Sequence, residues 1–456
     1  MNNKVSEYFC SLKNKRVAVL GIGVSNRPLI RMLLDYGIHT IACDRMEREC
    51  LEQEVLDLEA SGAILKVGAT YLDDLDADVV FRTPGMHPDI PALCQLRERG
   101  AVITSEMEAF FSVCPCKIIA VTGSDGKTTT TTLISRMLEQ AGMKVWIGGN
   151  IGQPLLPVAN QMQSEDFAVV ELSSFQLMNM KQSPHIAVVT NLAPNHLDVH
   201  KDMEEYISAK ENIYLYQVPG DKLVLNLDNK ITASFASKAK GKVIWFSRQK
   251  KTDGAYFDGD SVFYHDDIVM DRGEILLPGL HNVENYMAAL CAVQGLVSFE
   301  DVRAVAGRFG GVEHRIELVR ELDGVRYYND SIASSPTRTI AGLHAFDQKV
   351  ILIAGGYDKQ IPFDVLGPEI VDHVKYLILC GTTAEKIRNA VQSVPGYSDS
   401  LLPIVVTNNL KNAVLEAKNH AVDGDIVTLS PACAAFDQFK NFMVRGAAFK
   451  KLVREL

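Results

Sequence analysis

The stretch Lys117–Thr132, KIIAVTGSDGKTTTTT, organises the rest of the chain. Its first part, Lys117–Thr122, is a short apolar and β-branched run, which predicts a buried parallel strand. Gly123–Gly126 follows as a tight loop, and Lys127 and Thr128 open a Thr-rich helix. Strand, glycine loop and helix N-terminus form a cradle whose backbone N–H groups and helix dipole face an anion. The stretch therefore predicts a phosphate-binding site for a nucleoside triphosphate.

Two side chains of this stretch add specific chemistry. Lys127 contributes a full positive charge, and the hydroxyl of Thr128 suits Mg²⁺. The loop is shorter than the usual Walker A loop, because Val121 stands where the first glycine is expected. This short spacing separates nucleotide-using ligases from GTPases and kinases; a chance glycine-rich turn is the alternative. The predicted ATP-phosphate residues are Gly123, Ser124, Asp125, Gly126, Lys127, Thr128 and Thr129.

The composition is that of a globular enzyme. A chain of 456 residues predicts about three domains. A net charge of -10 argues against a nucleic-acid or anionic-membrane surface. Nine cysteines without a C-x-x-C pair suit reduced thiols better than disulfides or a zinc site. The N-terminus lacks an apolar targeting segment and no run reaches transmembrane length. We expect a cytoplasmic enzyme with neither nucleic-acid nor membrane partners.

The N-terminal part begins as a βαβ unit. Arg16–Leu20 predicts a strand that leads into the glycine loop Gly21–Asn26, and a second strand ends at Asp44 and Arg45. Two glycines of a dinucleotide fingerprint are present, but Asn26 occupies the third position. The pattern favours a nucleotide diphosphate over NAD, with a plain βα turn as the alternative. A further strand, Val79–Arg82, ends in Thr83-Pro84-Gly85, where open α/β sheets usually meet their ligand.

Two later strands carry candidate metal ligands. Glu171 lies near the end of the strand Phe167–Leu172 and could hold Mg²⁺ as a Walker B acid does. His196 follows the next strand, Ile186–Asn191, and could be a second ligand oriented by Asp198. A surface glutamate and a solvated histidine are the alternatives. Spacing and composition give Lys210, on the following helix, no distinguishing mark.

The remaining chain repeats the α/β alternation. Asn282 and Asn285 fall on one helical face and could bind a base edge, with a helix N-cap as the alternative for Asn282. Four strands then lead into loops with Gly, Ser or Asp: Val325–Tyr328, Lys349–Ala354, Tyr376–Cys380 and Asp425–Leu429. This pattern predicts a second doubly wound sheet with its ligand at one edge. Arg315, just before this domain, could reach the transferring phosphoryl group.

The predicted fold is therefore α/β with three domains. Residues 1–113 form an N-terminal Rossmann-like domain, and residues 114–313 a central P-loop ATPase-like domain with a parallel sheet. Residues 314–456 form a C-terminal Rossmann-like domain.

Together, the phosphate loop, VVELSSFQL at Val169–Leu177 and SPACAAFDQFKNF at Ser430–Phe442 resemble the Mur ligases. The resemblance spans all three domains and is greatest to the D-glutamate-adding members. It implies a ligase of peptidoglycan precursor synthesis that uses ATP, two Mg²⁺ ions and the substrates UDP-MurNAc-L-Ala and D-glutamate. It also implies an acyl-phosphate intermediate. We expect the C-terminal domain to close over ATP and protect this intermediate from water. We expect a monomer.

The resemblance also implies residue roles. Lys210, in SAKENIY, matches a lysine carried as a carbamate, which would require CO₂; the metal ligands would be Thr128, Glu171, His196 and this carbamate. The catalytic residues implied are Lys127, Glu171, His196, Lys210 and Lys359. Further ATP contacts are implied for Asn282, Asn285, Arg315 and Asp330. UDP-sugar contacts are implied for Gly23, Val24, Ser25, Asp44, Arg45, Thr83, Pro84, Gly85 and Asn150.

The D-glutamate side departs from the family pattern at two places. Ile332-Ala333-Ser334 follows Asp330-Ser331, where the family often has Lys-Ala-Thr, and Ala435 replaces a frequent serine. The carboxylate clamp must then depend on Lys359, Ser334 and the backbone near Phe442.

Three other functions compete with this interpretation. One is a ligase of the same group with another acceptor or amino acid. Another is a nucleotide-binding switch or regulatory ATPase, which needs the phosphate loop but not Arg16–Asp44 or Lys359. An NAD oxidoreductase is disfavoured by the missing third glycine and the central ATP motif.

Overall fold

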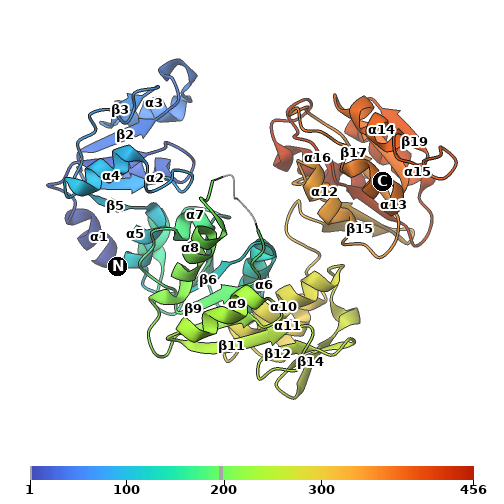
Figure 1. Ribbon diagram of the computed structural model, residues 1–456, viewed down its shortest axis with the longest axis horizontal. Helices are drawn as coiled ribbons and strands as arrows, with labels where there is room; N and C mark the ends of the chain where they lie inside the picture. Colours follow the sequence, from blue (N-terminus) through green and yellow to red (C-terminus); the bar gives the residue numbers. More distant parts are fainter. Residues whose placement is uncertain (1–2, 195–198) are drawn as a thin grey trace. The chain divides into compact units, whose positions relative to one another are not determined.

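The computed structural model describes residues 3–194 and 199–456, and these residues build three sheets. The chain divides into two compact units. Unit 1 comprises Met1–Glu274 and Val283–Val305, and unit 2 comprises Ile275–Asn282 and Ala306–Leu456. In Figure 1, unit 1 runs from blue to yellow, and unit 2 contains the orange and red elements. The α/β fold class is thereby confirmed, while the boundaries at residues 113/114 and 313/314 remain predictions.

The first sheet of unit 1 is wholly parallel, with strand order β3-β2-β1-β4-β5. Because strand order reverses on either side of β1, the loops after β1 and β4 meet at a topological switch point. Its strands are β1 (Val17–Leu20), β2 (Thr40–Asp44), β3 (Ile64–Val67), β4 (Val79–Arg82) and β5 (Val102–Thr104). Its helices are α1 (Asn3–Cys10), α2 (Asn26–Asp35), η1 (Arg48–Cys50), α3 (Gln53–Ala60), α4 (Pro91–Glu98) and α5 (Glu106–Val113).

The second sheet of unit 1 has nine strands in the order β14-β13-β12-β11-β10-β9-β6-β8-β7. The strands from β7 to β12 are parallel, and β13 and β14 extend the sheet antiparallel. The strands are β6 (Lys117–Thr122), β7 (Val145–Gly149), β8 (Phe167–Glu171), β9 (Ile186–Val189), β10 (Lys222–Asn226), β11 (Lys242–Ser247), β12 (Ala255–Phe257), β13 (Ser261–Tyr264) and β14 (Asp267–Asp271).

The helices that accompany this second sheet begin with α6, the predicted helix of the phosphate loop, which contacts β6, β7 and β8. They are α6 (Lys127–Gln140), η2 (Leu156–Gln161), α7 (Ser174–Leu177), α8 (Met203–Leu215), α9 (Lys230–Ser234), η3 (Phe235–Lys238), η4 (Arg272–Glu274), α10 (Leu280–Val293) and α11 (Phe299–Ala306). None of the helices in the described residues is long and apolar enough to cross a membrane.

Unit 2 contains a six-stranded sheet of order β15-β16-β20-β17-β18-β19, in which only the β15–β16 pair is antiparallel among the described pairs. Helices α12 to α14 pack on one face and α15 and α16 on the other (Figure 1). The strands are β15 (Glu317–Leu322), β16 (Val325–Asn329), β17 (Val350–Ala354), β18 (Val374–Cys380), β19 (Ile404–Thr407) and β20 (Ile426–Leu429). The helices are α12 (Pro336–Leu343), α13 (Leu366–His373), α14 (Ala384–Gln392), α15 (Leu410–His420) and α16 (Phe442–Arg454).

The cores follow from the apolar runs that the sequence places on these strands. The residues of β17, VILIA, are all buried, as parallel strands covered by helices on both faces require. The final helix, α16, contributes Phe449 and Val453 to the core, whereas Val444 on the same helix is exposed.

Phe449→Ala is expected to destabilise unit 2 by about 3–5 kcal/mol, because it removes a fully buried ring and leaves a cavity. Urea unfolding followed by circular dichroism measures the change. Val444→Ala, on the exposed side of α16, is the control and should lie within about 0.5 kcal/mol of wild type. Equal effects of the two substitutions would contradict the packing described.

A buried carboxyl group lies at the start of α5. Glu106 Oε1 accepts a hydrogen bond of 3.0 Å from the backbone N–H of Leu156, at the start of η2. Burial raises the pKa of Glu106 from 4.5 to about 7, and the hydrogen bond from Leu156 opposes this rise only in part. The folded unit therefore keeps a proton on Glu106 that the unfolded chain releases between pH 4.5 and 7.

Glu106→Gln is expected to become more stable relative to wild type as pH rises from 4.5 to 7, and to show a constant difference above pH 7. The raised pKa makes wild-type stability fall across this window, by roughly 3 kcal/mol for one proton over 2–3 pH units. Both tryptophans, Trp146 and Trp245, lie in unit 1, so their fluorescence during urea unfolding reports this unit. A difference independent of pH would contradict a protonated Glu106.

Candidate active site

The phosphate loop is held by tight packing against other parts of unit 1. Gly123 has φ of 149° and Gly126 has φ of 77°, in the region that favours glycine. A Cβ at Gly123 would overlap the hydroxyl of Thr190, after β9, and a Cβ at Gly126 would overlap the side-chain oxygen of Asn285 on α10. Both glycines of the predicted loop are therefore required by backbone shape and by neighbouring atoms.

Hydrogen bonds fasten the same loop to the segment that follows β9. The N–H of Ser124 donates to the Asn191 carbonyl at 2.9 Å, and the Ser124 hydroxyl donates to the Ala193 carbonyl at 2.9 Å. The Thr190 hydroxyl donates to the Asp125 carbonyl at 2.6 Å. The loop is thus preorganised, and the N-terminus of α6, with first-turn N–H groups that lack intrahelical acceptors, begins directly after it.

Lys127 extends across this loop. Its ammonium group donates to the Gly123 carbonyl at 3.1 Å and to the Ser124 carbonyl at 2.9 Å. The positive charge is therefore held at the helix N-terminus, where the Lys127 ammonium group and the helix dipole would both attract a phosphate anion.

The register of the central sheet brings three predicted residues together. Val121 of β6 pairs with Glu171 at the end of β8. Glu171 is 1% exposed; one carboxylate oxygen accepts from the Thr128 hydroxyl at 2.7 Å and the other from the Asn150 amide at 2.7 Å. The Thr128 hydroxyl and the Glu171 carboxylate are hard oxygen donors of the kind that Mg²⁺ takes, so these two residues fit the predicted ion.

A glycine allows Asn150 to approach. Gly149 has φ of 93°, and a Cβ there would overlap the backbone carbonyl of Glu171. The backbone N–H of Asn150 also donates to that carbonyl at 2.8 Å. The second glycine-rich loop predicted from the sequence therefore lies against the acid at the end of β8.

Lys210 lies beneath the phosphate loop. It comes from α8 and is 2% exposed, and its amine donates to the Gly123 carbonyl at 2.9 Å and the Thr122 hydroxyl at 3.2 Å. The amine also lies 4.9 Å from the ring centroid of Tyr206. Burial, followed by the nearby charge of Lys127, holds the pKa of Lys210 well below its ordinary value. Burial thus distinguishes Lys210 from the solvated lysines of other helices, which its position in the sequence did not.

The other central residues occupy varied places. Thr129 is buried in the first turn of α6, and Asn285 accepts from the Thr130 hydroxyl at 3.3 Å. Asn282 is the third residue of α10, so it is not the N-cap, and its amide donates to the Pro278 carbonyl at 2.7 Å. His196 and Asp198 lie outside the described residues.

The first sheet brings its predicted ligand residues to one edge. Gly21, with φ of 84°, lies against Thr83, and the Thr83 N–H donates to the Leu20 carbonyl at 3.0 Å. Asp44 accepts from the Ile22 N–H at 2.8 Å, which joins the end of β2 to the glycine loop. Loop residues Gly23, Val24 and Ser25 are exposed, as are Arg45 and Gly85, whereas Pro84 is half-buried.

Asn26, at the third fingerprint position, has a structural role. It is buried, and its amide donates to the Gly21 carbonyl at 2.8 Å. The Asn26 side chain therefore stabilises the turn through a hydrogen bond that a glycine at this position could not make.

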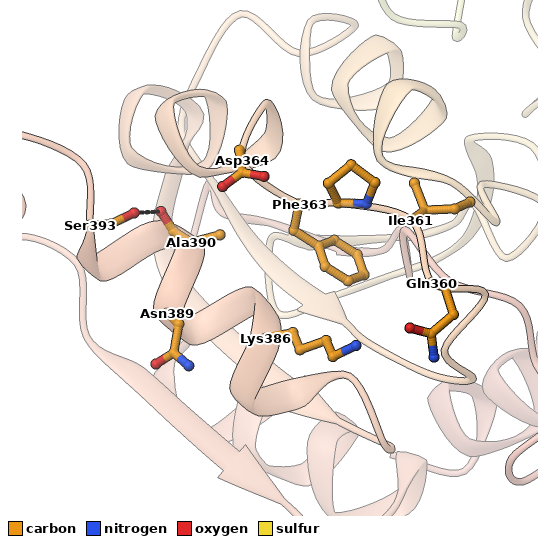
Figure 2. Close-up of a pocket in the computed structure, with 9 residues that line it drawn as sticks. Gln360, Ile361, Phe363, Asp364, Lys386, Asn389, Ala390 and Ser393 are labelled. Carbon is orange, nitrogen blue, oxygen red and sulfur yellow. Dashed lines mark hydrogen bonds between the residues drawn. The ribbon is translucent and has the colours of Figure 1, made fainter.

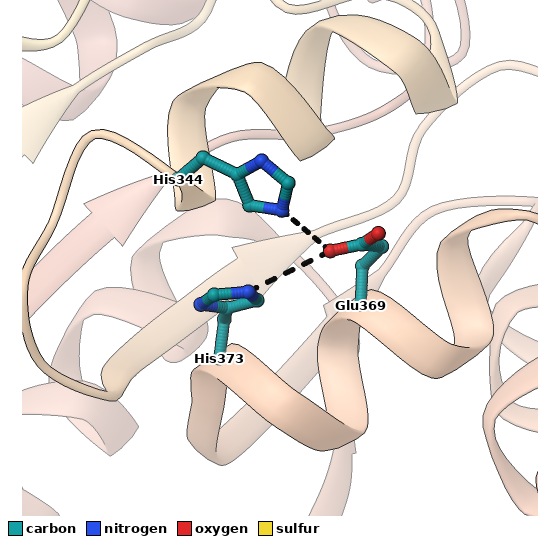
Figure 3. Close-up of side chains that lie close together, drawn as sticks. All are labelled: His344, Glu369 and His373. Carbon is teal, nitrogen blue, oxygen red and sulfur yellow. Dashed lines mark hydrogen bonds and ion pairs between the residues drawn. The ribbon is translucent and has the colours of Figure 1, made fainter.

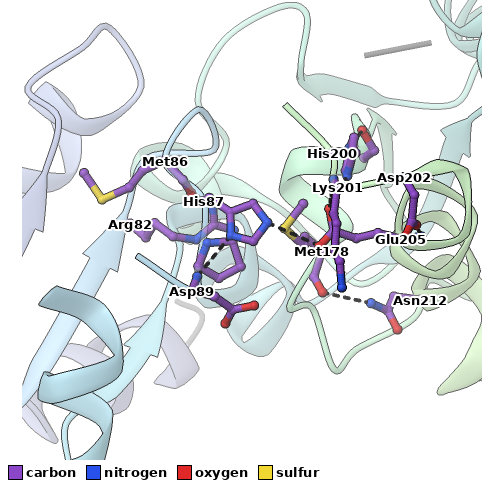
Figure 4. A network of polar contacts seen from close by, with 12 residues as sticks. Arg82, Met86, His87, Asp89, Met178, His200, Lys201, Asp202, Glu205 and Asn212 are labelled. Carbon is purple, nitrogen blue, oxygen red and sulfur yellow. Dashed lines mark hydrogen bonds and ion pairs between the residues drawn. The ribbon is translucent and has the colours of Figure 1, made fainter. Parts of the chain in front are cut away.

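Sequence reasoning missed Arg82, which shapes the neighbouring loop. Its buried guanidinium donates to the carbonyls of Pro84 and Met86 at 3.1 and 2.6 Å, and to the Phe175 carbonyl on α7 at 3.1 Å (Figure 4). Burial lowers the pKa of Arg82. The sequence signal that could have identified Arg82 is a basic residue at the end of an otherwise apolar strand.

A chain of polar contacts continues from this loop. His87 Nε2 lies 3.4 Å from one carboxylate oxygen of Glu205, and the other oxygen lies 3.2 Å from His200 Nδ1 (Figure 4). His200 Nε2 lies 2.8 Å from the Ser174 hydroxyl, and the ring stacks on Phe175. The loop after β4 is thereby connected to the VVELSSFQL segment.

Asp330 lies at the end of β16 in unit 2. Its carboxylate oxygens accept from the Ser430 hydroxyl at 2.7 Å and the Ile316 N–H at 3.3 Å. Burial raises the pKa of Asp330 to about 7, although Ser430 and the charge of Arg315 act in the opposite direction. Because the residue after Arg315 bonds to Asp330 and the Arg315 charge acts on its carboxyl group, the structure brings these two predicted nucleotide contacts near one another.

Arg445 organises the predicted D-glutamate side and was also missed. Its buried guanidinium donates to the hydroxyl and carbonyl of Ser331 at 3.0 and 2.9 Å, and to the carbonyls of Cys433 and Ala434. The Ser331 hydroxyl in turn donates to the Phe442 carbonyl at 2.8 Å. Phe442 is thereby joined to the end of β16.

The other two residues of the predicted clamp have separate surroundings. The Ser334 hydroxyl donates to the Ile332 carbonyl at 3.1 Å, within its own turn, and Lys359 is exposed after β17. A hollow of about 360 Å³ lies near Lys359 in the sequence, between residues 360–364 and α14 (Figure 2). Lys359, Ser334 and Phe442 are absent from its lining, which comprises Gln360, Ile361, Pro362, Phe363, Asp364, Lys386, Asn389, Ala390 and Ser393.

The chain matches two family models. Residues 121–293 match the Mur ligase middle domain, and residues 314–433 match the Mur ligase, glutamate ligase domain. The first range contains the segment Val169–Leu177 and most of the phosphate loop, and the second contains only the start of the motif Ser430–Phe442.

Similarity extends over whole chains. The chain is 51% identical to the UDP-N-acetylmuramoylalanine--D-glutamate ligases of Clostridium novyi (strain NT) and Acetivibrio thermocellus, with 100% of each chain covered. A solved UDP-N-acetylmuramate-alanine ligase from Thermotoga maritima has the same fold, with a TM-score of 0.59 at 16% identity. That match covers 97% of this chain and 100% of the other. The chain therefore belongs to the Mur ligase family, in the group of the UDP-N-acetylmuramoylalanine--D-glutamate ligases.

Proposed function

We propose that the chain joins D-glutamate to UDP-MurNAc-L-Ala, with conversion of ATP to ADP and phosphate. The observation that carries this proposal is the contact of Thr128 and Asn150 with the buried carboxylate of Glu171, beside the phosphate loop. A 51% identity over the full length of ligases with that name supports the choice of substrates.

Charge repulsion is the main barrier to this reaction. The alanyl carboxylate of the UDP-sugar must approach the γ-phosphate of ATP, and both are anions. Lys127 holds its ammonium group on the loop carbonyls, and Thr128 and Glu171 would hold Mg²⁺ together with His196. Two Mg²⁺ ions, when bound, would neutralise phosphate charge.

The chemistry then requires positioning and no covalent nucleophile from the protein. A carboxylate oxygen attacks the γ-phosphorus, the bond to the bridging oxygen breaks, and ADP leaves with the bonding electrons. The amine of D-glutamate attacks the resulting acyl carbon, phosphate leaves, and the nitrogen loses a proton to give the amide.

The proposal assigns Lys210 a carbamate. Because burial lowers its pKa, a neutral amine is available to form an N–C bond with CO₂ and release one proton. The product is an anionic carbamate in place of the neutral amine that donates to the Gly123 carbonyl at 2.9 Å. Such an anion would add a carboxylate to the donors near Glu171, which favours bound metal.

The proposed substrate sites use the strand ends of the five-stranded sheet of unit 1 and of the six-stranded sheet of unit 2. The UDP-sugar would bind the edge at which Gly21, Asp44 and Thr83 meet. D-Glutamate would bind unit 2 near Ser334, Lys359 and Phe442, where Ile332 and Ala435 depart from the family pattern. Ala435 is buried and has no hydroxyl, and its backbone carbonyl accepts from the N–H groups of Gln438 and Phe439 at 3.1 and 2.8 Å.

We further propose a cytoplasmic monomer. All nine cysteines are free, which suits a reducing compartment.

The central experiment supplies ATP, Mg²⁺, UDP-MurNAc-L-Ala and D-glutamate, and measures the amide product by mass together with ADP and phosphate. One amide, one ADP and one phosphate are expected per turnover, with strict dependence on D-glutamate. Product formed with another amino acid would favour a different ligase of the group. ATP hydrolysis that ignores the UDP-sugar would favour a regulatory ATPase.

Lys210→Ala is expected to lower turnover by at least about 10–100-fold, because the metal site loses a donor. Added formate or acetate should restore part of the activity by supplying a carboxylate in the vacated volume. Lys230→Ala, at an exposed lysine on α9, is the matched control and should keep full turnover. Normal turnover in Lys210→Ala would exclude the carbamate.

A further inference from the structure

A second group of potential metal ligands lies in unit 2, apart from the proposed ligase residues. His344 follows α12, and Glu369 and His373 lie on α13 (Figure 3). Glu369 Oε2 lies 2.6 Å from His344 Nε2 and 3.6 Å from His373 Nε2. The three ligand atoms all lie within 4.8 Å of one another. Figure 3 shows both imidazole rings directed toward the same carboxylate oxygen.

The fold fixes this arrangement from two sides. Glu369 and His373 are four residues apart, so they project from the same face of α13. His344 is the C-cap of α12, and its backbone N–H donates to the Ile340 carbonyl. Leu343 of α12 and Ile370 of α13 share one core, so packing holds the two helices together beneath the cluster.

The separations lie close to those on the face of a metal tetrahedron. Zinc takes histidine nitrogen and carboxylate oxygen at about 2.0–2.2 Å, which puts neighbouring ligand atoms roughly 3.3 Å apart. The side chains are between about a third and a half exposed, so small side-chain rotations can bring the separations of 2.6 and 3.6 Å, and the third separation of at most 4.8 Å, to this value. Solvent can occupy the fourth position.

We propose that His344, Glu369 and His373 form a binding site for Zn²⁺ or a similar imidazole-binding divalent cation. Two imidazoles and one carboxylate are a zinc donor set. Mg²⁺ prefers a shell of oxygen ligands and binds imidazole poorly, so the Mg²⁺ required for ATP leaves this site free. The site joins the end of α12 to α13, and a bound ion therefore clamps these helices together. It does not depend on the proposed ligase activity.

The chain contains a matched control. His420 and Glu416 on α15 form another i,i+4 pair, with Nδ1 and Oε1 3.3 Å apart. Within the part of the chain that the structure describes, this pair belongs to no three-ligand group. A lone His–Glu pair should bind zinc much more weakly than the three-residue cluster.

The test titrates Zn²⁺ into the full chain by calorimetry with millimolar Mg²⁺ present, and repeats the titration with Co²⁺ by visible absorption. His344→Gln/His373→Gln is expected to lose one equivalent of Zn²⁺ and the corresponding Co²⁺ bands, whereas His420→Gln retains both. Metal bound elsewhere, for example by Cys114 and Cys116, is common to all variants and cancels. Equal stoichiometry in wild type and the double variant would overturn the proposal.

Hydrogen exchange provides a second readout. Zn²⁺ is expected to slow amide exchange in α12 and α13 of the wild-type chain and of His420→Gln, because the ion clamps these helices. The double variant should show no such slowing at the same zinc concentration. Unchanged exchange in wild type with zinc bound would show that the ion lies elsewhere and would equally overturn the proposal.

Discussion

The contact between β6 and β8 is the constraint on which the site of unit 1 depends. Pairing of Val121 with Glu171 carries a carboxylate to the base of the phosphate loop, and Glu171 is almost wholly removed from solvent there. A buried carboxylate is costly unless it is hydrogen-bonded. Thr128 and Asn150 supply those bonds. The Glu171 carboxylate therefore holds the phosphate loop and the second glycine-rich loop together.

Cations complete the same electrostatic arrangement. Lys127 and Lys210 approach one set of loop carbonyls from different sides, and their mutual repulsion adds to the burial that lowers the pKa of Lys210. One ammonium group faces the helix N-terminus, where phosphate would neutralise it. The other has no exposed side, so its neutral form is favoured.

Each unit also contains a buried arginine that bonds mainly backbone carbonyls. Arg82 holds the turn after β4 and reaches α7, and Arg445 holds Ser331 to the SPACAAF segment. A guanidinium has five donors in a fixed plane, so one side chain can order several carbonyls of an irregular loop. Burial lowers the pKa of Arg445 to about 10, so it remains charged at neutral pH. Both loops adjoin residues proposed to bind substrates.

The sequence by itself determined the three α/β segments and most of their strands. Val79–Arg82 and Lys117–Thr122 form strands with the predicted bounds, because a mainly apolar run that leads into a glycine-containing loop suits a buried parallel strand. The glycine loops and the motif residues Lys127, Thr128 and Glu171 were also readable, since their chemistry lies within a few neighbouring residues. The antiparallel additions β13, β14 and β15 were missed, because they carry mixed polar and apolar residues.

Tertiary structure alone decided which of the remaining residues matter. Lys210 meets Thr122 across 88 residues, and Arg445 meets Ser331 across 114. Local periodicity contains no information about such contacts, and burial, which shifts pKa values and limits hydrogen-bond partners, exists only once the chain has folded. The local sequence therefore specifies the phosphate loop, and the assembled sheet specifies the buried lysine and carboxylate beside it.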